Sequence, residues 1–218
     1  MKISFPRFLI LCLAVTGLLV TPSCNLFEKN QTSNFMLRLL SLTGLPPGED
    51  TTNISEIGTA IIYSDVIHWL DDGTKDGANY FSTDYAIAEV EMGFLNPDIV
   101  DDYASVYTDL TIYRVDVEFS RPDGRNIPGE TIPRPFSLSV NARLTPDLVL
   151  YMPFPVVRVM EKQSRPLSDL YYSGEIQLNC TCTFYARDSG ERDAKPETGT
   201  ITIMCSNYMD LDDTGGGE

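Results

Sequence analysis

The sequence predicts an all-β fold, an antiparallel immunoglobulin-like β-sandwich of about seven strands. Apolar and polar residues alternate with a period of two along most of the chain after residue 58, as in strands that bury one face. Clusters of Gly, Pro, Asn and Asp separate the alternating segments. The long amphipathic helices of an alternating α/β fold are missing from the pattern, so a closed barrel is the main alternative.

The first expected strand spans residues 58–70. The residues expected on its inner face are Ile61, Tyr63, Ile67 and Trp69. The second expected strand, residues 85–94, alternates apolar residues with Glu89 and Glu91. In the third, residues 113–119, the inward residues are expected to be Tyr113, Val115, Val117 and Phe119. Each of these segments therefore has one apolar face with which to pack in a sandwich.

Two further strands follow a connection rich in proline and glycine. Residues 136–144 alternate apolar residues with Ser, Asn and Arg, and residues 148–159 are rich in β-forming residues. Proline cannot donate a hydrogen bond to a neighbouring strand. Pro153 and Pro155 therefore predict a bulge, an edge position or a change of sheet within residues 148–159.

Three cysteines lie in the final expected hairpin, which follows a short helical connection at residues 165–170. The alternation places Cys180, Cys182 and Cys205 on the core face. One possibility is a disulfide across the hairpin, from Cys205 to Cys180 or to Cys182. The other is three reduced thiols that pack as small hydrophobes. A zinc site that adds His68 has the right ligand count, but His68 is remote in the sequence, which disfavours this site.

The first 24 residues carry the pattern of a secretory signal. Lys2 and Arg7 precede a short uncharged apolar run, and residues 1–23 are predicted to be a signal peptide. The small residues before Cys24 resemble the lipobox of bacterial lipoproteins, in which this cysteine is acylated and becomes the new N-terminus. Thr21 departs from that pattern, which usually has an aliphatic residue there. The alternative is ordinary signal cleavage, which leaves a secreted or periplasmic protein with Cys24 as a spare thiol.

Beyond the signal peptide, the sequence divides into three segments. Residues 24–57 are expected to be a lipid-anchor tether and irregular segment, in which residues 35–42 fit either a short helix or a strand. Residues 58–209 are expected to form the β-sandwich domain, and residues 210–218 a disordered acidic tail. Lipoproteins kept at the inner membrane typically have Asp after the lipidated cysteine. This chain has Asn25 there, so the resemblance implies an outer-membrane anchor.

The chain is strongly acidic. It has 16 Lys and Arg against 31 Asp and Glu, a formal net charge of −15 over 218 residues. A surface of this charge repels phosphate backbones, so the sequence disfavours nucleic-acid binding. It also disfavours docking on anionic lipid headgroups, so we expect the N-terminal lipid to provide the contact with the membrane.

The sequence contains little that indicates catalysis or a cofactor. It has one histidine, His68, and neither a nucleophile-elbow motif nor a phosphate-binding loop. We therefore expect no catalytic residue, no cofactor and no enzyme activity. Asp71, Asp72 and Asp76 lie in a glycine-containing loop and are candidates for calcium ligands. Their spacing does not match a calcium-binding loop, so a solvated turn is the favoured interpretation.

The connection at residues 121–136 (RPDGRNIPGETIPRPF) is the most distinctive internal segment. Its turn residues and prolines favour a structured link between two core strands. A second interpretation is a rigid loop that presents polar side chains to a partner. The candidates for that role are Arg121, Asp123, Arg125 and Asn126.

This connection and the final hairpin (TFYARDSGERDAKPETGTITI) resemble uncharacterised bacterial envelope lipoproteins with a β-sandwich domain. The resemblance implies a fold and a location but no chemistry. With the signal pattern, it leads us to expect a non-catalytic accessory, adhesion or assembly component that contacts an envelope protein or a polymer. The alternative is a module that binds a glycan, a small molecule or calcium. Its aromatic candidates are Tyr103, Tyr107, Tyr171 and Tyr172.

Overall fold

The computed structural model describes residues 32–45, 59–67, 80–95, 109–146 and 148–208. The chain divides into two compact units, and the strands below belong to the unit from Ser33 to Glu218. Several expectations fall outside the described residues and stay predictions. They are the signal peptide, the lipidated Cys24, the calcium candidates Asp71, Asp72 and Asp76, and the acidic tail. Within the described ranges, no helix is long and apolar enough to cross a membrane.

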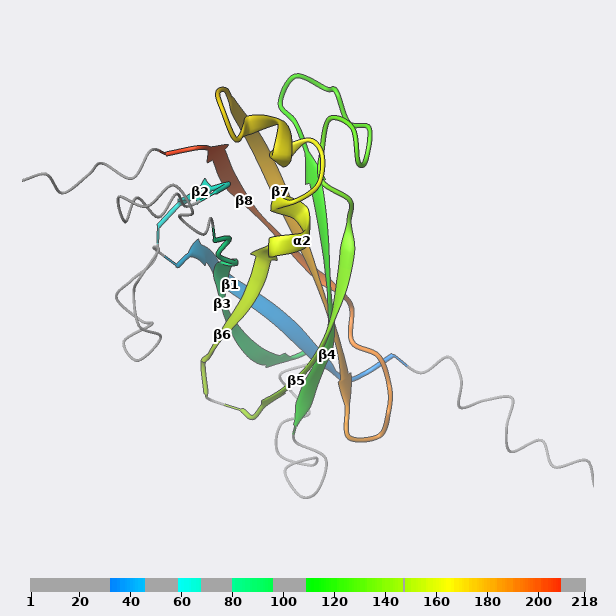
Figure 1. The fold of residues 1–218 in the computed structure, drawn as a ribbon. Coiled ribbons are helices and arrows are strands. Elements are labelled where there is room, and N and C mark those ends of the chain that lie inside the picture. Colours follow the sequence, from blue (N-terminus) through cyan, green and yellow to red (C-terminus); the bar gives the residue numbers. More distant parts are fainter. Residues whose placement is uncertain (1–31, 46–58, 68–79, 96–108, 147, 209–218) are drawn as a thin grey trace, which may run out of the picture. The chain divides into compact units, whose positions relative to one another are not determined.

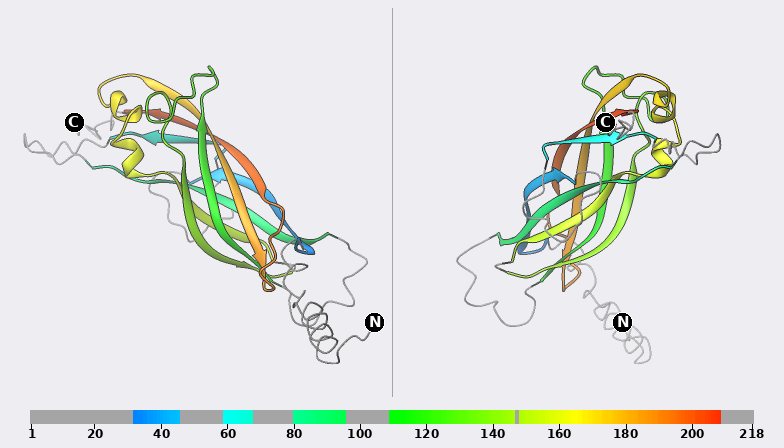
Figure 2. Two further views of the ribbon diagram at one scale, coloured as in Figure 1. Left: turned by 90° about the vertical axis from the view of Figure 1, so that its right-hand side faces the viewer. Right: turned by 60° about the vertical axis from the view of Figure 1, so that its left-hand side comes forward.

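Eight strands in the described residues form two sheets, which confirms the all-β prediction (Figure 1, Figure 2). The three-stranded sheet has the order β1 (Phe35–Gly44), β3 (Asp84–Phe94) and β6 (Leu150–Val157). The five-stranded sheet has the order β2 (Ile61–Asp65), β8 (Glu197–Ser206), β7 (Glu175–Asp188), β4 (Leu110–Ser120) and β5 (Phe136–Leu144). Paired strands are antiparallel, except that β2 and β8 run parallel. The helix α2 (Val159–Lys162) and the 3₁₀ helix η4 (Leu167–Leu170) connect β6 to β7, and η4 is the helical connection expected there.

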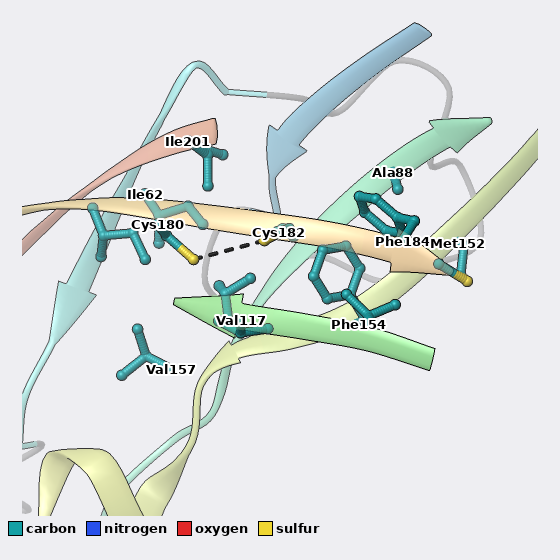
Figure 3. Close-up of a cluster of buried hydrophobic side chains, with 14 of the residues drawn as sticks. Ile62, Ala88, Val117, Met152, Phe154, Val157, Cys180, Cys182, Phe184 and Ile201 are labelled. Carbon is teal, nitrogen blue, oxygen red and sulfur yellow. Dashed lines mark hydrogen bonds between the residues drawn. The ribbon is translucent and has the colours of Figure 1, made fainter. Parts of the chain in front are cut away.

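The core lies where the apolar faces of the two sheets meet (Figure 3). Phe154 of β6 contacts Phe184 of β7 edge to face, with ring centroids 5.5 Å apart. Val117, Cys180 and Cys182 line the same core from the five-stranded sheet. The alternation predicted for β3, β5, β7 and β8 is confirmed, because the apolar residues at alternate positions of these strands are buried or half-buried.

The strand β1 corrects the predicted domain boundary. It lies within residues 24–57, which the sequence analysis assigned to a tether and irregular segment. Phe35 and Leu37 are 5% and 1% exposed, so this strand is part of the core. Beyond a register shift between Leu39 and Ser41, β1 continues to pair with β3 up to Gly44. The ambiguous apolar segment is thus a strand, because β3 provides the hydrogen-bond partners of its backbone groups.

Within β2, the sequence analysis assigned the wrong residues to the inner face. Ile61 and Tyr63 are 37% and 56% exposed, whereas Ile62 and Ser64 are buried. The reason is the parallel register with β8, which places Ile62 beside the inward Ile203 and Ser64 beside the inward Cys205. Residues that are neighbours across a strand pair share a face. Ile67 is buried as predicted, and Trp69 lies outside the described residues.

The inward orientation predicted for Tyr113 is also wrong. The register of β4 against β7 shifts between Ile112 and Arg114. Ile112 and Val115 both point into the core, so the two residues between them lie on the outer face. A β-bulge of this kind inserts one residue and reverses the alternation beyond it. The other inward residues predicted for this strand are confirmed: Val115, Val117 and Phe119.

The prolines of β6 lie in an edge strand with a register shift, two of the alternatives that the sequence predicts. β6 is an edge strand of the three-stranded sheet. Its register against β3 shifts between Asp84 and Tyr85, opposite Val157 and Pro155. The strand ends at Val157, and the residues that follow form α2 rather than the continuous strand expected to residue 159.

Candidate functional site

A buried ionic cluster joins the two sheets near α2. The ammonium Nζ of Lys162 lies 3.0 Å from Oδ2 of Asp84 on β3 and donates to the backbone oxygen of Asp65 at 2.6 Å. The hydroxyl of Ser64 on β2 donates to Oδ2 of Asp84 at 2.6 Å. The side chains of Lys162 and Asp84 are 0% and 8% exposed. The hydroxyl of Tyr171 donates to the backbone oxygen of Lys162 at 2.8 Å and so holds α2 in place.

This cluster has the composition of a reactive site but the geometry of a structural one. Its serine hydroxyl donates to the Asp84 carboxylate, and the same carboxylate oxygen is paired with the Lys162 ammonium in the buried interior. Its lysine is held by a carboxylate and a backbone oxygen. The polar atoms of these buried residues face one another, which is how buried charges are stabilised. The cluster therefore fastens β2, β3 and α2 together.

A second buried carboxylate organises the turn between β7 and β8. Asp188 has a fully buried side chain, and its Oδ2 accepts from Nε of Arg192 at 2.9 Å and from the hydroxyl of Ser33 at 3.0 Å. Its Oδ1 accepts from the backbone N–H groups of Gly190 and Arg192. The backbone N–H of Ser33 donates to the oxygen of Asp193 at 3.0 Å. This network fixes the residues that lead into β1 against the hairpin turn.

We expect Asp188→Ala to lower the free energy of unfolding by about 3 kcal/mol, because it leaves several buried donors without their acceptor. Urea denaturation of the full chain measures this change. The matched control is Asp123→Ala, which removes an exposed carboxylate from another loop and is expected to cost less than about 1 kcal/mol. Equal losses in the two variants would contradict the structural role of Asp188.

The three hairpin cysteines are free, buried thiols. The β7–β8 register places Cys180 opposite Ile201 and Cys205 opposite Ile176, so neither disulfide register considered from the sequence is the observed one. The sulfurs of Cys180 and Cys182 are 3.7 Å apart, the distance of a weak thiol hydrogen bond and too long for a disulfide. Burial, together with the nearby Asp84 charge, raises the pKa of Cys205 to about 12. The contact with Cys182 and burial also raise the pKa of Cys180. The thiols thus pack as small hydrophobes.

We expect the native chain to resist alkylation at Cys180, Cys182 and Cys205 at neutral pH, because a thiolate is the reactive form. Peptide mass spectrometry after iodoacetamide treatment measures this, with Ser173→Cys as an exposed control that should react. Because the pKa of Cys205 is raised in the folded state, its contribution to stability is complete below the ordinary value of 9.0. That contribution is lost as the pH rises toward about 12, so alkaline unfolding should accompany labelling. Rapid native labelling at neutral pH would contradict this prediction.

The connection at residues 121–136 is held by its own polar side chains. The carboxylate of Asp123 accepts from the guanidinium groups of Arg121 and Arg125, each at 2.7 Å. Hydrogen bonds from Arg121 and then from Arg125 lower the pKa of Asp123 to about 2. Oδ1 of Asn126 accepts from the backbone N–H of Arg121 at 2.7 Å. The four candidate residues are therefore brought together and support the structured-link interpretation, while partner binding by this loop stays a prediction.

A cluster that the sequence analysis missed lies on the outer face of the five-stranded sheet. We call it the outer Tyr–Arg cluster, and it consists of Tyr113 and Arg114 on β4 and of Tyr185 and Arg187 on β7. The guanidinium carbon of Arg114 is 3.8 Å from the ring centroid of Tyr185, and that of Arg187 is 4.0 Å from the ring centroid of Tyr113. The two rings are 6.5 Å apart. The bulge in β4 creates the cluster by turning Tyr113 outward.

The other candidates give no assembled site in the described part of the chain. Among the described residues, no group of three or more His, Cys, Asp or Glu side chains is arranged to hold a metal ion. His68, Tyr103 and Tyr107 lie outside those residues. Tyr171 is half-buried and bonded to Lys162, whereas Tyr172 is 87% exposed. The aromatic row considered from the sequence is thus not assembled by Tyr171 and Tyr172.

The described fold and site together define an all-β protein of two packed sheets whose buried polar clusters serve the fold. Comparison with family models, curated proteins and solved structures finds no match to this chain. The resemblance to bacterial envelope lipoproteins therefore stays a prediction.

Proposed function

We propose that this chain is a non-catalytic, lipid-anchored protein of the bacterial envelope, and that it acts as an accessory, adhesion or assembly component by binding another protein. The outer Tyr–Arg cluster is the observation that carries the proposal. Tyr and Arg are the residue types that most often dominate binding energy at protein interfaces. In this cluster, each guanidinium already lies against a ring, so binding immobilises little further side-chain freedom.

We also propose that the fold is an immunoglobulin-like sandwich. With β1 and β2 taken as one first strand split between the sheets, the chain has the strands A, B, C, C′, E, F and G. The sheet orders β1-β3-β6 and β2-β8-β7-β4-β5 then read A-B-E and A-G-F-C-C′, as in that class of sandwich. The bond from Tyr171, before β7, to the upstream oxygen of Lys162 is similar to the tyrosine corner at the E–F turn of such domains.

Site-specific photo-cross-linking in cells tests the proposed surface. A photoreactive residue replaces Glu118, which is exposed on β4 four residues beyond Arg114 of the outer Tyr–Arg cluster. The matched control replaces Arg38 on the outer face of the three-stranded sheet. We expect a discrete adduct with an envelope protein at position 118 and none at position 38. The adduct should disappear in an Arg114→Ala/Arg187→Ala variant that retains its thermal unfolding midpoint. An adduct that survives both substitutions would overturn the proposed surface.

The lipid anchor has its own test. Intact-protein mass spectrometry of the detergent-extracted native chain should find a protein that begins at Cys24 and carries a diacylglycerol and an acyl group. A bare chain that begins near Cys24 would overturn the lipid anchor and leave a secreted or periplasmic protein. This result is independent of the cross-linking result, so location and partner binding are tested separately.

One observation favours a glycan-binding module as the second candidate. Tyr85 and Tyr151 are 41% and 37% exposed on the outer face of the three-stranded sheet. The hydroxyl of Tyr151 donates to the carboxylate of Glu89 at 3.3 Å, and a ring beside a carboxylate is a surface on which a sugar can stack and bond. A rise in the thermal unfolding midpoint with an envelope polysaccharide, lost in Tyr151→Ala, would favour this candidate.

A further inference from the structure

The edge strand β5 differs from the other edges of the two sheets. In the described part of the chain, β5 pairs with β4 on one side and ends the five-stranded sheet on the other. Proteins protect sheet edges with short strands, prolines, charges or covering segments. β2 has five residues, β6 contains Pro153 and Pro155, and β1 packs against β8 at Gly199. β5 has nine residues, no proline and one charged residue, Arg143, and its one irregularity is a register shift against β4 between Ala142 and Ser139.

The inner face of β5 is incompletely covered. Its inward residues pack against the core but stay half-buried, whereas most inward residues of β4 and β7 are fully buried. The half-buried row consists of Phe136, Leu138, Val140 and Ala142. The sheet opposite has three strands against five, so β5 lies at the margin of the packed region. A strand added beyond β5 would cover part of this row and satisfy the edge backbone groups at the same time.

The composition of β5 points to a second copy of this chain as the occupant. The strand contains no acidic residue, although the whole chain carries a formal charge of −15, so two copies meet at β5 with little of the repulsion expected elsewhere. Its alternation is also self-complementary. In an antiparallel pair of β5 strands, a two-fold axis midway between any residue and its copy places apolar side chains opposite apolar ones, and Ser, Asn and Arg opposite one another.

We propose that two copies of this chain associate through antiparallel pairing of their β5 strands. The two five-stranded sheets then form one continuous sheet. A two-fold axis perpendicular to that sheet keeps both outer faces on the same side. The dimer thereby presents two outer Tyr–Arg clusters on one surface. The pairing does not depend on the proposed function, because it involves neither the cluster nor the lipid anchor.

The test measures the molar mass of the full chain in detergent by sedimentation over a range of concentrations. We expect a dimer for the native chain and a monomer for Ser137→Lys/Ser139→Lys, which places two like charges on the outer side of each β5 strand. The matched control is Thr198→Lys/Thr200→Lys, which adds the same charges at exposed positions of β8, inside the sheet, and should stay dimeric. A native monomer at all concentrations overturns the proposal, and so does a dimer that survives the β5 lysines.

Hydrogen exchange provides a second measurement that does not depend on a variant. The backbone amides of β5 that point away from β4 should exchange slowly in the dimer and rapidly after dilution to monomer. The amides of β2, the opposite edge of the same sheet, should exchange at the same rate in both states. Equal exchange of β5 in dimer and monomer would place the dimer contact elsewhere and overturn the proposal. A partner adduct at position 118 can still form in that case, so the two proposals fail separately.

Discussion

Lys162→Met is expected to lower the free energy of unfolding by about 3–5 kcal/mol, one of the two largest effects we expect for a single substitution in this protein. The side chain of Lys162 is fully buried, and its ammonium compensates the buried carboxylate of Asp84 and bonds the backbone oxygen of Asp65. Methionine has a similar volume, so the substitution removes the charge and the donors without opening a cavity. Chemical denaturation of the full chain at neutral pH measures the loss.

The double variant Lys162→Met/Asp84→Leu removes both charges of the ion pair, whereas Lys162→Met leaves the buried carboxylate of Asp84 without its partner. An apolar pair of similar volume often restores stability, because it removes the cost of desolvating two charges. We therefore expect the double variant to be more stable than Lys162→Met alone. Arg38→Met is the control for an exposed pair, since Arg38 and Glu91 are 55% and 31% exposed, and it should cost less than about 1 kcal/mol. Similar losses for Lys162→Met and Arg38→Met would show that the buried cluster does not stabilise the fold.

Phe184→Ala is expected to cost about 3–5 kcal/mol, because it removes a fully buried ring and leaves a cavity between the sheets. Phe184 projects from β7 and meets Phe154 from β6, so the loss affects the contact between the two sheets (Figure 3). Thermal and urea unfolding measure it. The control is Tyr172→Ala, which truncates an aromatic side chain that is 87% exposed and should change the free energy of unfolding by less than about 0.5 kcal/mol.

A double-mutant cycle with Phe154→Ala measures the contact itself. The edge-to-face geometry at 5.5 Å predicts a coupling energy of about 0.5–1.5 kcal/mol beyond the burial of each ring. Additive losses would mean that the two rings are buried independently. The inter-sheet contact would then make no separate contribution to stability.

The strands that the sequence predicted most accurately are those with one uniformly apolar face. In β3, β5 and the β7–β8 hairpin, the period of two identifies the inward residues, because a slip of one residue would expose the whole apolar face. β1 was ambiguous, because its apolar run fits a helix as well as a strand and its partner β3 lies far along the chain. Only pairing with that strand distinguishes the two conformations.

The register of the final hairpin shows where local pattern stops being informative. The alternation placed Cys180, Cys182 and Cys205 on the core face, and all three are buried. It left open which residues face each other, because hairpin loops that differ by a few residues have similar closure entropies. The observed register is held by the pairing of β7 with β4 and by the turn around Asp188, and it leaves Cys205 opposite Ile176.

The sequence by itself determined that this protein is built from strands with one buried face, because that property depends only on the alternation of side chains along each strand. The tertiary structure alone decided which residues form the buried ionic cluster and the outer Tyr–Arg cluster. Asp84 and Lys162 are 78 residues apart, and the outward position of Tyr113 depends on a bulge set by the register against β7. Such contacts arise when strands that are distant in the sequence pair with each other. The free energy of that pairing cannot be inferred from the alternation of residues within one strand.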